Sequence, residues 1–362
     1  MAINDFMDRA VSAIQQYHSF HEALSSKLVP LKIQGAPDSV ENVVVPVKRI
    51  QLSAVVAGVD SGFVPKKLAF LDLLLIKAAG VVFEYREGLL QNSAYLPRVV
   101  SFPEPIMLRS SLENDEVGQS TSLERLRKEV SLSIEVIEKF KPKYFFIDGS
   151  IVPQYQDKPR KESEINADYH SIVECFQSLY SAAEKNSCTL ISCVEDSRGS
   201  RFNQIMREEI LPKSKISVSR GTLEKTFDSV FLDYFLNEGE RTFAFPYTKN
   251  TDNHAILKDY SKQWSESIFV FYLKASAHDK PLRVEFICKK NSGDGLKKCA
   301  DEISETVFSL SCLHKEYVYP SILIEADLRA RLTPNEINII YEKLIDKVGT
   351  KVMLRRNARP FG

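Results

Sequence analysis

The sequence predicts an α/β fold with a mixed sheet, and the order of its apolar segments carries that prediction. Three strand-like runs come first, and then helices and strands alternate. The strands are expected at 54–60, 67–76, 80–85, 143–148 and 189–195, and the helices at 121–140 and 163–185. The segment at 77–80 is short enough for a hairpin turn. A hairpin gives antiparallel neighbours and the later alternation gives parallel ones, so the sheet is expected to be mixed.

Composition excludes several classes of protein. The 362 residues are 44% hydrophobic and 27% charged, which is typical of a globular chain. Lys and Arg together number 48, as do Asp and Glu, so the formal net charge is +0 and any contact with DNA needs a local basic patch. The sequence contains no C-x-x-C pair, which argues against a Cys-rich zinc site. Its apolar runs are all shorter than the ~20 residues of a membrane span. Without a recognisable signal peptide, we expect a reduced, cytoplasmic protein with no membrane contact.

One domain over 1–362 is expected, because no linker or repeat divides the chain. An N-terminal helix at 1–30 has an apolar stripe at three- and four-residue steps, formed by Phe6, Ala10, Ile14, Tyr17, Phe20, Leu24 and Leu28. It is expected to pack against the body, and an oligomer contact is the alternative. The core spans about 50–335, with an excursion at about 198–263 and a basic tail at 351–362. Further elements are expected as helices at 203–209, 228–236, 296–310, 321–331 and 334–347, and strands at 268–274 and 282–288.

Two strands end in the same pattern, an apolar run followed by an aspartate and small residues. These are Val-Val-Ala-Gly-Val-Asp60-Ser-Gly and Tyr-Phe-Phe-Ile-Asp148-Gly-Ser. Ligands of open α/β sheets bind beyond the carboxyl ends of strands, where an acid beside small residues can hold a metal. A single Asp-Gly or Asp-Ser would more simply start a turn. The repetition on two strands makes a metal site an equal alternative.

The helix between these strands should supply a third carboxylate. Six strand residues cover ~20 Å at ~3.3 Å each, and a helix returns that distance in ~13 residues. Counting back from Lys141 reaches Glu129, with Glu124 as the second choice. Glu129 lies on the flank of the apolar stripe of this helix, which suits a ligand and a solvated glutamate equally.

A fourth acid, Asp327, lies on a late helix after Tyr319-Pro320. Ion pairs with Arg329 or Arg331 are its simpler explanation. A strand Asp, a helix Glu, a strand Asp and a late-helix Asp together form the pattern of RNase H-like nucleases. Hard Mg²⁺ or Mn²⁺ ions take such oxygen ligands, and two of them ~3.5–4 Å apart can promote phosphodiester hydrolysis. No Cys, Ser or His nucleophile is needed.

The ordered set of motifs resembles the NurA family of DNA-end-processing nucleases. The resemblance rests on Ala-Gly-Val-Asp60-Ser-Gly, Phe-Phe-Ile-Asp148-Gly-Ser, Glu195-Asp-Ser-Arg198-Gly-Ser and the segment at 319–332. It implies an RNase H-like core, Mn²⁺- or Mg²⁺-dependent 5′-to-3′ exonuclease activity on DNA ends, and endonuclease activity on single strands. It further implies a homodimer, a HerA-type hexameric ATPase as partner, and a role in double-strand break resection or in defence.

Two positions depart from the pattern of that family. Asp327 stands where the family usually has His, which preserves a metal ligand and favours Mg²⁺. Glu195 stands where the family often has Lys, which removes a phosphate contact. A catalytically inactive subunit that binds DNA or a partner therefore remains an alternative, and an enzyme acting on RNA is another.

Contacts with DNA are expected from the densest basic segment. Arg198 and Arg201 follow a strand end and are the preferred phosphate contacts, whereas solvated surface charge is the simpler role of Arg207, Lys213, Lys215, Arg220 and Lys225. Tyr155 could stack on a base, although a buried position is the simpler expectation.

Overall fold

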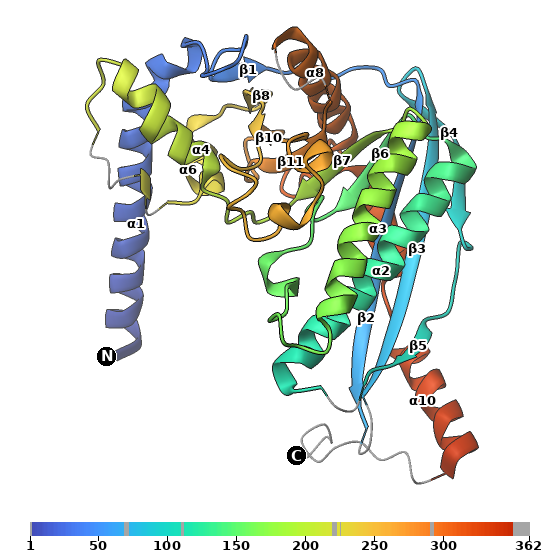
Figure 1. The fold of residues 1–362 in the computed structure, drawn as a ribbon. Helices are drawn as coiled ribbons and strands as arrows, with labels where there is room; N and C mark the ends of the chain where they lie inside the picture. The colour runs from blue at the N-terminus through green and yellow to red at the C-terminus, as the bar shows by residue number, and fades with distance from the viewer. Residues whose placement is uncertain are drawn as a thin grey trace. The chain divides into compact units, whose positions relative to one another are not determined.

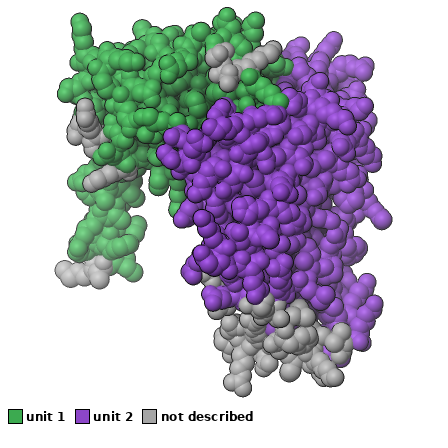
Figure 2. All heavy atoms as spheres, viewed as in Figure 1, with its two compact units in different colours: residues 1–50, 194–249, 267–319 green, residues 51–193, 250–266, 320–362 purple. Residues whose placement is uncertain are grey.

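The structure is a computed structural model that describes residues 2–68, 72–109, 112–218, 223–224, 226–289 and 293–349. Arg220, Lys225 and the basic tail at 351–362 lie outside the described residues. The chain folds into two compact units, each built from separate stretches: unit 1 from 1–50, 194–249 and 267–319, and unit 2 from 51–193, 250–266 and 320–362 (Figure 2). None of the described helices is long and apolar enough to cross a membrane.

Unit 2 contains a mixed sheet with helices on both faces. In sheet order its strands are β7 (Thr189–Val194), β6 (Tyr144–Asp148), β2 (Ala54–Lys67), β3 (Asp72–Arg86) and β4 (Leu89–Leu96), and β5 (Glu104–Met107) also pairs with β3. Strands β7, β6 and β2 are parallel, whereas β3 is antiparallel to β2, β4 and β5. Its helices are α2 (Asn114–Phe140), α3 (Asn166–Lys185), α7 (Lys262–Ser265), α9 (Ser321–Ala330) and α10 (Pro334–Val348), with short 3-10 turns η2 (Tyr155–Asp157) and η5 (Leu257–Asp259).

The helices α2 and α9 cover opposite faces of the strand pair β2–β3. A β-carbon on Gly80 of β3 would meet Val136 of α2, and one on Gly58 of β2 would meet Ile322 of α9. Helices α2 and α3 lie side by side in Figure 1, in agreement with their packing contacts. The amphipathic α10 packs its apolar face on Leu73 and Leu75 of β3.

The sequence predicts β2, α2, β6, α3 and β7 in the correct order, but it divides β3 into two strands and misses β4 and β5. The predicted hairpin at 77–80 is wrong, because β3 runs unbroken through these residues and pairs with β2 along its whole length. The third antiparallel strand is β4, where no strand was predicted. Within β3, Gly80 allows Val136 of α2 to pack closely on the strand.

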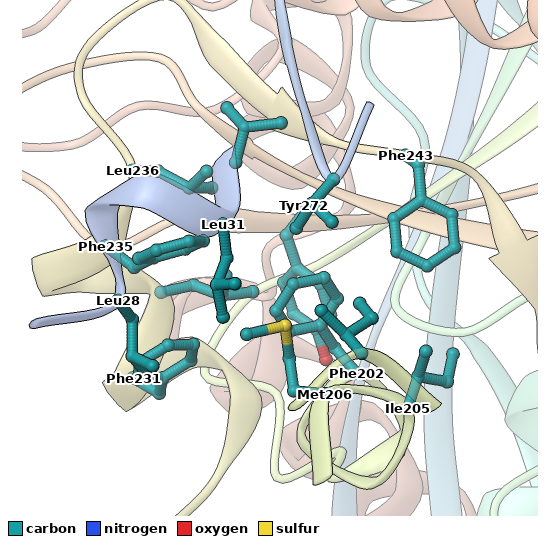
Figure 3. Close-up of a cluster of buried hydrophobic side chains, with 14 of the residues drawn as sticks. Leu28, Leu31, Phe202, Ile205, Met206, Phe231, Phe235, Leu236, Phe243 and Tyr272 are labelled. Atoms are coloured by element: carbon teal, nitrogen blue, oxygen red, sulfur yellow. The ribbon is translucent and has the colours of Figure 1, made fainter. Parts of the chain in front are cut away.

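Unit 1 has a smaller antiparallel group of strands. In sheet order they are β1 (Val44–Pro46), β8 (Glu240–Thr242), β10 (Ile268–Lys274) and β11 (Leu282–Ile287), with β9 (Phe245–Pro246) also on β10. Its helical elements are α1 (Ala2–Leu28), η1 (Val29–Ile33), α4 (Arg201–Ile205), η3 (Met206–Ile210, a π-helix), η4 (Leu211–Lys213), α6 (Asp228–Phe235) and α8 (Gly293–Leu310). The core combines aromatic and aliphatic side chains, and in it Phe202, Phe231 and Tyr272 pack with Leu28 and Leu31 (Figure 3).

The N-terminal helix α1 packs from His18 onward: His21 is buried and stacks on the Tyr234 ring, and His18 Nδ1 lies 2.9 Å from the Tyr234 hydroxyl. Leu24 and Leu28 are buried, and the Ser25 hydroxyl donates to the carbonyl of Tyr234 on α6 at 2.6 Å. Phe6 and Ile14, from the same predicted stripe, are exposed. The expectation that the whole stripe packs against the body is therefore wrong, because Tyr17 and Phe20 are exposed as well. The oligomer contact stays a prediction.

Candidate metal centre

The parallel pairing of β2 and β6 brings Asp60 and Asp148 together. Val59 pairs with Ile147, so the two aspartates are the next residues on strands that lie ~4.8 Å apart. Asp148 ends β6, as predicted. Asp60 does not end its strand, because β2 continues to Lys67 against β3. The predicted strand end is in fact the point where β2 loses β6 as its neighbour.

The turn after Asp148 requires a glycine. Gly149 has φ +79°, a left-handed conformation that residues with a β-carbon adopt at a cost. The Gly149 N–H donates to the Cys193 carbonyl at 2.9 Å, and the Gly149 carbonyl accepts a hydrogen bond from the Ser192 hydroxyl. The end of β6, and with it Asp148, is thereby attached to β7.

Asp60 lies between two glycines on the face of β2 that α9 covers. Gly58, Asp60 and Gly62 share this face because strand side chains alternate. A β-carbon on Gly62 would lie 2.5 Å from the Ala330 carbonyl oxygen at the end of α9, and one on Gly58 would meet Leu323 at 3.3 Å. The helix therefore approaches the strand closely at both glycines, and Asp60 is buried between these contacts.

Glu129 comes from α2, on the other face of β2. Its side chain is only 4% exposed, and Oε2 accepts hydrogen bonds from the Ser61 hydroxyl at 2.7 Å and from Arg125 Nη1 at 3.0 Å. Glu124, the second choice, is half-buried and pairs with Arg127. Counting back along the helix thus identifies the glutamate that lies near Asp60.

Asp327 lies on α9 and is the most exposed of the four acids. Its side chain is 53% exposed, and Oδ2 pairs with Arg331 at 3.0 Å. Arg329 pairs instead with Glu325, which also accepts a hydrogen bond from Tyr95. Asp327 therefore forms the expected ion pair with Arg331 and not with Arg329. Its role as a metal ligand stays a prediction.

Electrostatic repulsion couples all four acids. Burial raises the pKa of Asp60 to about 7, helped by the nearby charges of Asp148, Glu129 and Asp327 and opposed by the Ser61 N–H. Burial likewise raises the pKa of Glu129, against the effect of Arg125 and Ser61. Negative charge at Asp60 is thus poorly compensated by the protein itself.

The donor set suits a hard divalent cation. All four side chains offer carboxylate oxygen, the ligand that Mg²⁺ and Mn²⁺ prefer, and a cation would relieve the repulsion at Asp60. Among the described residues, no three His, Cys, Asp or Glu side chains already form a ligating group. Glu129 and Asp327 each contact an arginine one turn away on their own helix, and each would turn from it to complete a shell.

The predicted DNA contacts lie partly in the other unit. Arg198 and Arg201 belong to unit 1, where Arg198 is exposed and Arg201 Nη1 donates to Gln204 at 3.0 Å. Their role as phosphate contacts stays a prediction. Tyr155 belongs to unit 2 and is 77% exposed, so the expected buried position is wrong and base stacking remains open to it.

Sequence reasoning missed Ser61 and Arg125, which hold Glu129. The signal for Arg125 was its spacing of four residues from Glu129 on a helix, which places the two side chains on one face. Ser61 gave no signal beyond its place beside Asp60, because only the tertiary structure brings it to α2.

Comparison with known proteins identifies the family. A family model described as NurA domain matches residues 54–332. The NurA nuclease from Sulfolobus solfataricus is 16% identical, and the match covers 96% of this chain and 98% of that chain with a TM-score of 0.56. A NurA structure solved with manganese is 11% identical over 95% of this chain and 99% of that chain, with a TM-score of 0.49. No curated protein matches the sequence.

The family model confirms the predicted resemblance, and the Sulfolobus structure confirms the predicted fold class. The likeness to the Sulfolobus structure concerns the fold, which has the antiparallel strands β2, β3 and β4 followed by α2, β6, α3 and β7. That is the RNase H-like α/β arrangement, with α1 and further helices and strands added to it. The family model covers more than half of the chain, so this protein belongs to the NurA family.

Proposed function

We propose that the chain is a metal-dependent deoxyribonuclease that uses Asp60, Glu129, Asp148 and Asp327 to hold Mg²⁺ or Mn²⁺, as a pair of ions. The observation that carries the proposal is the convergence of these carboxylates on Asp60, whose pKa is raised to about 7. A buried acid whose pKa is raised by burial and by neighbouring acids is a candidate for a functional site.

The side chains have distinct tasks in this proposal. Asp60 and Asp148 lie on neighbouring strands and would form the rigid part of the site, with Asp60 releasing its proton as the cation binds. Ser61 and Arg125 orient Glu129, and Asp327 approaches from α9. A bound divalent cation supplies the Lewis acidity that activates water and stabilises charge on the scissile phosphate.

The finer assignment follows the family to which the chain belongs. It comprises 5′-to-3′ exonuclease activity on DNA ends, endonuclease activity on single strands, a homodimer, and a HerA-type hexameric ATPase that delivers DNA during double-strand break resection. Arg198 and Arg201 would contact backbone phosphates, so binding should weaken steeply with salt.

The test is cleavage of end-labelled linear DNA by the purified protein in EDTA, Mg²⁺ or Mn²⁺. We expect metal-dependent degradation that Asp148→Asn abolishes. The helix α2 offers a matched pair of variants: Glu129→Gln should lose most activity, whereas Glu124→Gln, five residues earlier on the same helix, should retain it. Equal activity in Glu129→Gln and Glu124→Gln would remove Glu129 from the site.

A catalytically inactive binding subunit is the second candidate, and the arginine contacts of Glu129 and Asp327 favour it. In that case no metal would support cleavage, with or without the ATPase, while DNA binding in EDTA would persist. Parallel assays on single-stranded RNA and on an RNA–DNA hybrid would distinguish a ribonuclease from both candidates.

A further inference from the structure

Lys77 is a buried lysine in the middle of β3. The sequence places it in a predicted turn, where an exposed lysine would be ordinary. In the structure it is 7% exposed, and its strand neighbours Ile76 and Ala78 are buried as well. Burial of an ammonium group is costly unless the group is paired and hydrogen-bonded. The contacts of Lys77 therefore need an explanation.

Those contacts join β3 to the junction of α9 and α10. Lys77 Nζ donates to Glu336 Oε1 at 3.0 Å and to the Arg331 carbonyl oxygen at 3.3 Å. Arg331 is the C-cap of α9, directly after its last residue, Ala330. Glu336 also accepts a hydrogen bond from the Thr333 N–H at 2.8 Å, which closes the capping box of α10. One ammonium group thus fixes the end of one helix and the start of the next.

This junction lies beside the acidic site along the sheet. Lys77 pairs with Gly62, and Ala79, two residues later, pairs with Asp60. Gly62 and Asp60 face α9, so Lys77 and Ala79 face it too. Farther along β2, α9 also packs closely at Gly58. The helix is held at both ends of the strand segment that contains Asp60.

Asp327 lies one helical turn before Arg331, within the part of α9 between these two contacts. We propose that Lys77 is a positioning residue for the acidic site: by holding the Arg331 carbonyl and Glu336, it sets the position of α9 and keeps Asp327 within reach of the cation bound at Asp60. This inference rests on the proposed function and assigns Lys77 no contact with substrate or metal.

Unit 1 offers a closely matched control. Lys274 of β10 is 4% exposed, forms an ion pair with Asp233, and donates to the Asp279 carbonyl oxygen at 2.6 Å. It therefore has the same burial and the same pair of acceptors as Lys77, a carboxylate and a backbone carbonyl. A purely structural role predicts equal consequences for Lys77→Met and Lys274→Met.

The experiment compares Mn²⁺ dependence in the full-length wild type, Lys77→Met and Lys274→Met. Mn²⁺ binding is measured by calorimetry without DNA, cleavage is measured against Mn²⁺ concentration, and melting temperature is recorded in EDTA. We expect Lys77→Met to need about tenfold more Mn²⁺ in both assays, the usual scale for residues that orient ligands. Lys274→Met should keep the wild-type dependence, even with a similar loss of melting temperature.

Coupling to Asp327 gives a second readout that a general loss of stability would not produce. Asp327→Asn should itself raise the Mn²⁺ requirement, and adding Lys77→Met to it should change that requirement less than about twofold. If Lys77→Met does not fold, Glu336→Gln takes its place, because it removes the same ion pair and leaves an oxygen for the α10 cap.

The possible failures are distinguishable. A wild type that binds and cleaves, with Lys77→Met indistinguishable from Lys274→Met, would overturn this inference alone. Additive effects of Lys77→Met and Asp327→Asn would also overturn it. A wild type that neither binds Mn²⁺ nor cleaves would overturn the proposed function and this inference together.

Discussion

Both units bury charged side chains, but they compensate the charge differently. In unit 1, fully buried Arg241 pairs with Glu41 and Asp301, and buried Arg283 pairs with Glu285. In unit 2, the charges that act on the buried acid Asp60 are those of other acids, Asp148, Glu129 and Asp327. The unit 1 clusters contain their own cations, whereas the unit 2 cluster has a surplus of anions.

The pKa directions express this difference. Although burial opposes it, the neighbouring Glu285 and Tyr272 raise the pKa of Arg283 well above its ordinary value, so the guanidinium is stabilised where it lies. Burial and repulsion raise the pKa of Asp60 to about 7, so its carboxylate is destabilised and gains from a proton or an added cation. An uncompensated buried charge such as that of Asp60 is therefore the better candidate for a functional site.

The largest expected effect is on catalysis at the uncompensated cluster. Asp60→Asn should lower the cleavage rate at saturating Mn²⁺ by about a thousandfold or more, since a metal contributes several kcal/mol of charge stabilisation. Its melting temperature in EDTA should not fall, because the substitution removes a repelled charge. Initial rates and thermal melts check both statements. An active Asp60→Asn protein would show that the uncompensated charge in unit 2 has no catalytic role.

Next in size is the effect of removing a cation from the compensated cluster. Arg241→Met leaves Glu41 buried without its partner and should lower the free energy of unfolding by about 3–5 kcal/mol. Urea denaturation measures the loss, with Arg9→Met as the control because Arg9 and Asp5 form an exposed pair worth about 0–1 kcal/mol. Similar losses of unfolding free energy in Arg241→Met and Arg9→Met would show that the buried Arg241 pair stabilises the fold no more than an exposed pair does.

A smaller effect concerns pH and the metal-free protein. The pKa of Asp60 rises from 3.8 to about 7 on folding, so its contribution to stability is complete below pH 4 and is lost as the pH rises through 7. The loss is about 4 kcal/mol at most, at about 1.36 kcal/mol for each pKa unit. Unfolding free energies in EDTA between pH 4 and 8 should fall more steeply for the wild type than for Asp60→Asn. Parallel profiles would mean that Asp60 is not destabilised by its neighbours.

The smallest effect is expected at Asp327, the exposed acid. Asp327→His places there the residue usual in the family and should change the cleavage rate by less than about tenfold. Imidazole suits Mn²⁺ better than Mg²⁺, so the ratio of the rate in Mn²⁺ to that in Mg²⁺ should rise. Rates in each metal at matched concentrations test this, and a fall in that ratio would argue against Asp327 as a ligand.

Local patterns predicted the parts of the site that depend on regular geometry. Asp60 and Asp148 follow apolar runs that form neighbouring parallel strands, and fixed helical rise was enough to choose Glu129 over Glu124. The sequence did not predict the continuation of β2 beyond Asp60 or the burial of Lys77. The continuation of β2 depends on its pairing with β3, where Gly62 lies opposite Lys77. The burial of Lys77 depends on Glu336 of α10. Local periodicity reveals neither partner.

The spacing Gly58-x-Asp60-x-Gly62 places all three residues on one face of β2, and a shift of the sequence by one position along the strand would move them to the other face. Even-numbered residues from 58 to 62 face α9, and Val59 and Ser61 face α2. An insertion or deletion of a single residue just before Gly58 that left the strand's pairing in place would exchange the two sets. The carboxylate would then point toward α2, and larger side chains would meet α9 where it tolerates only glycine. Homologous strands should therefore vary in length by even numbers upstream of this aspartate, or compensate with a bulge.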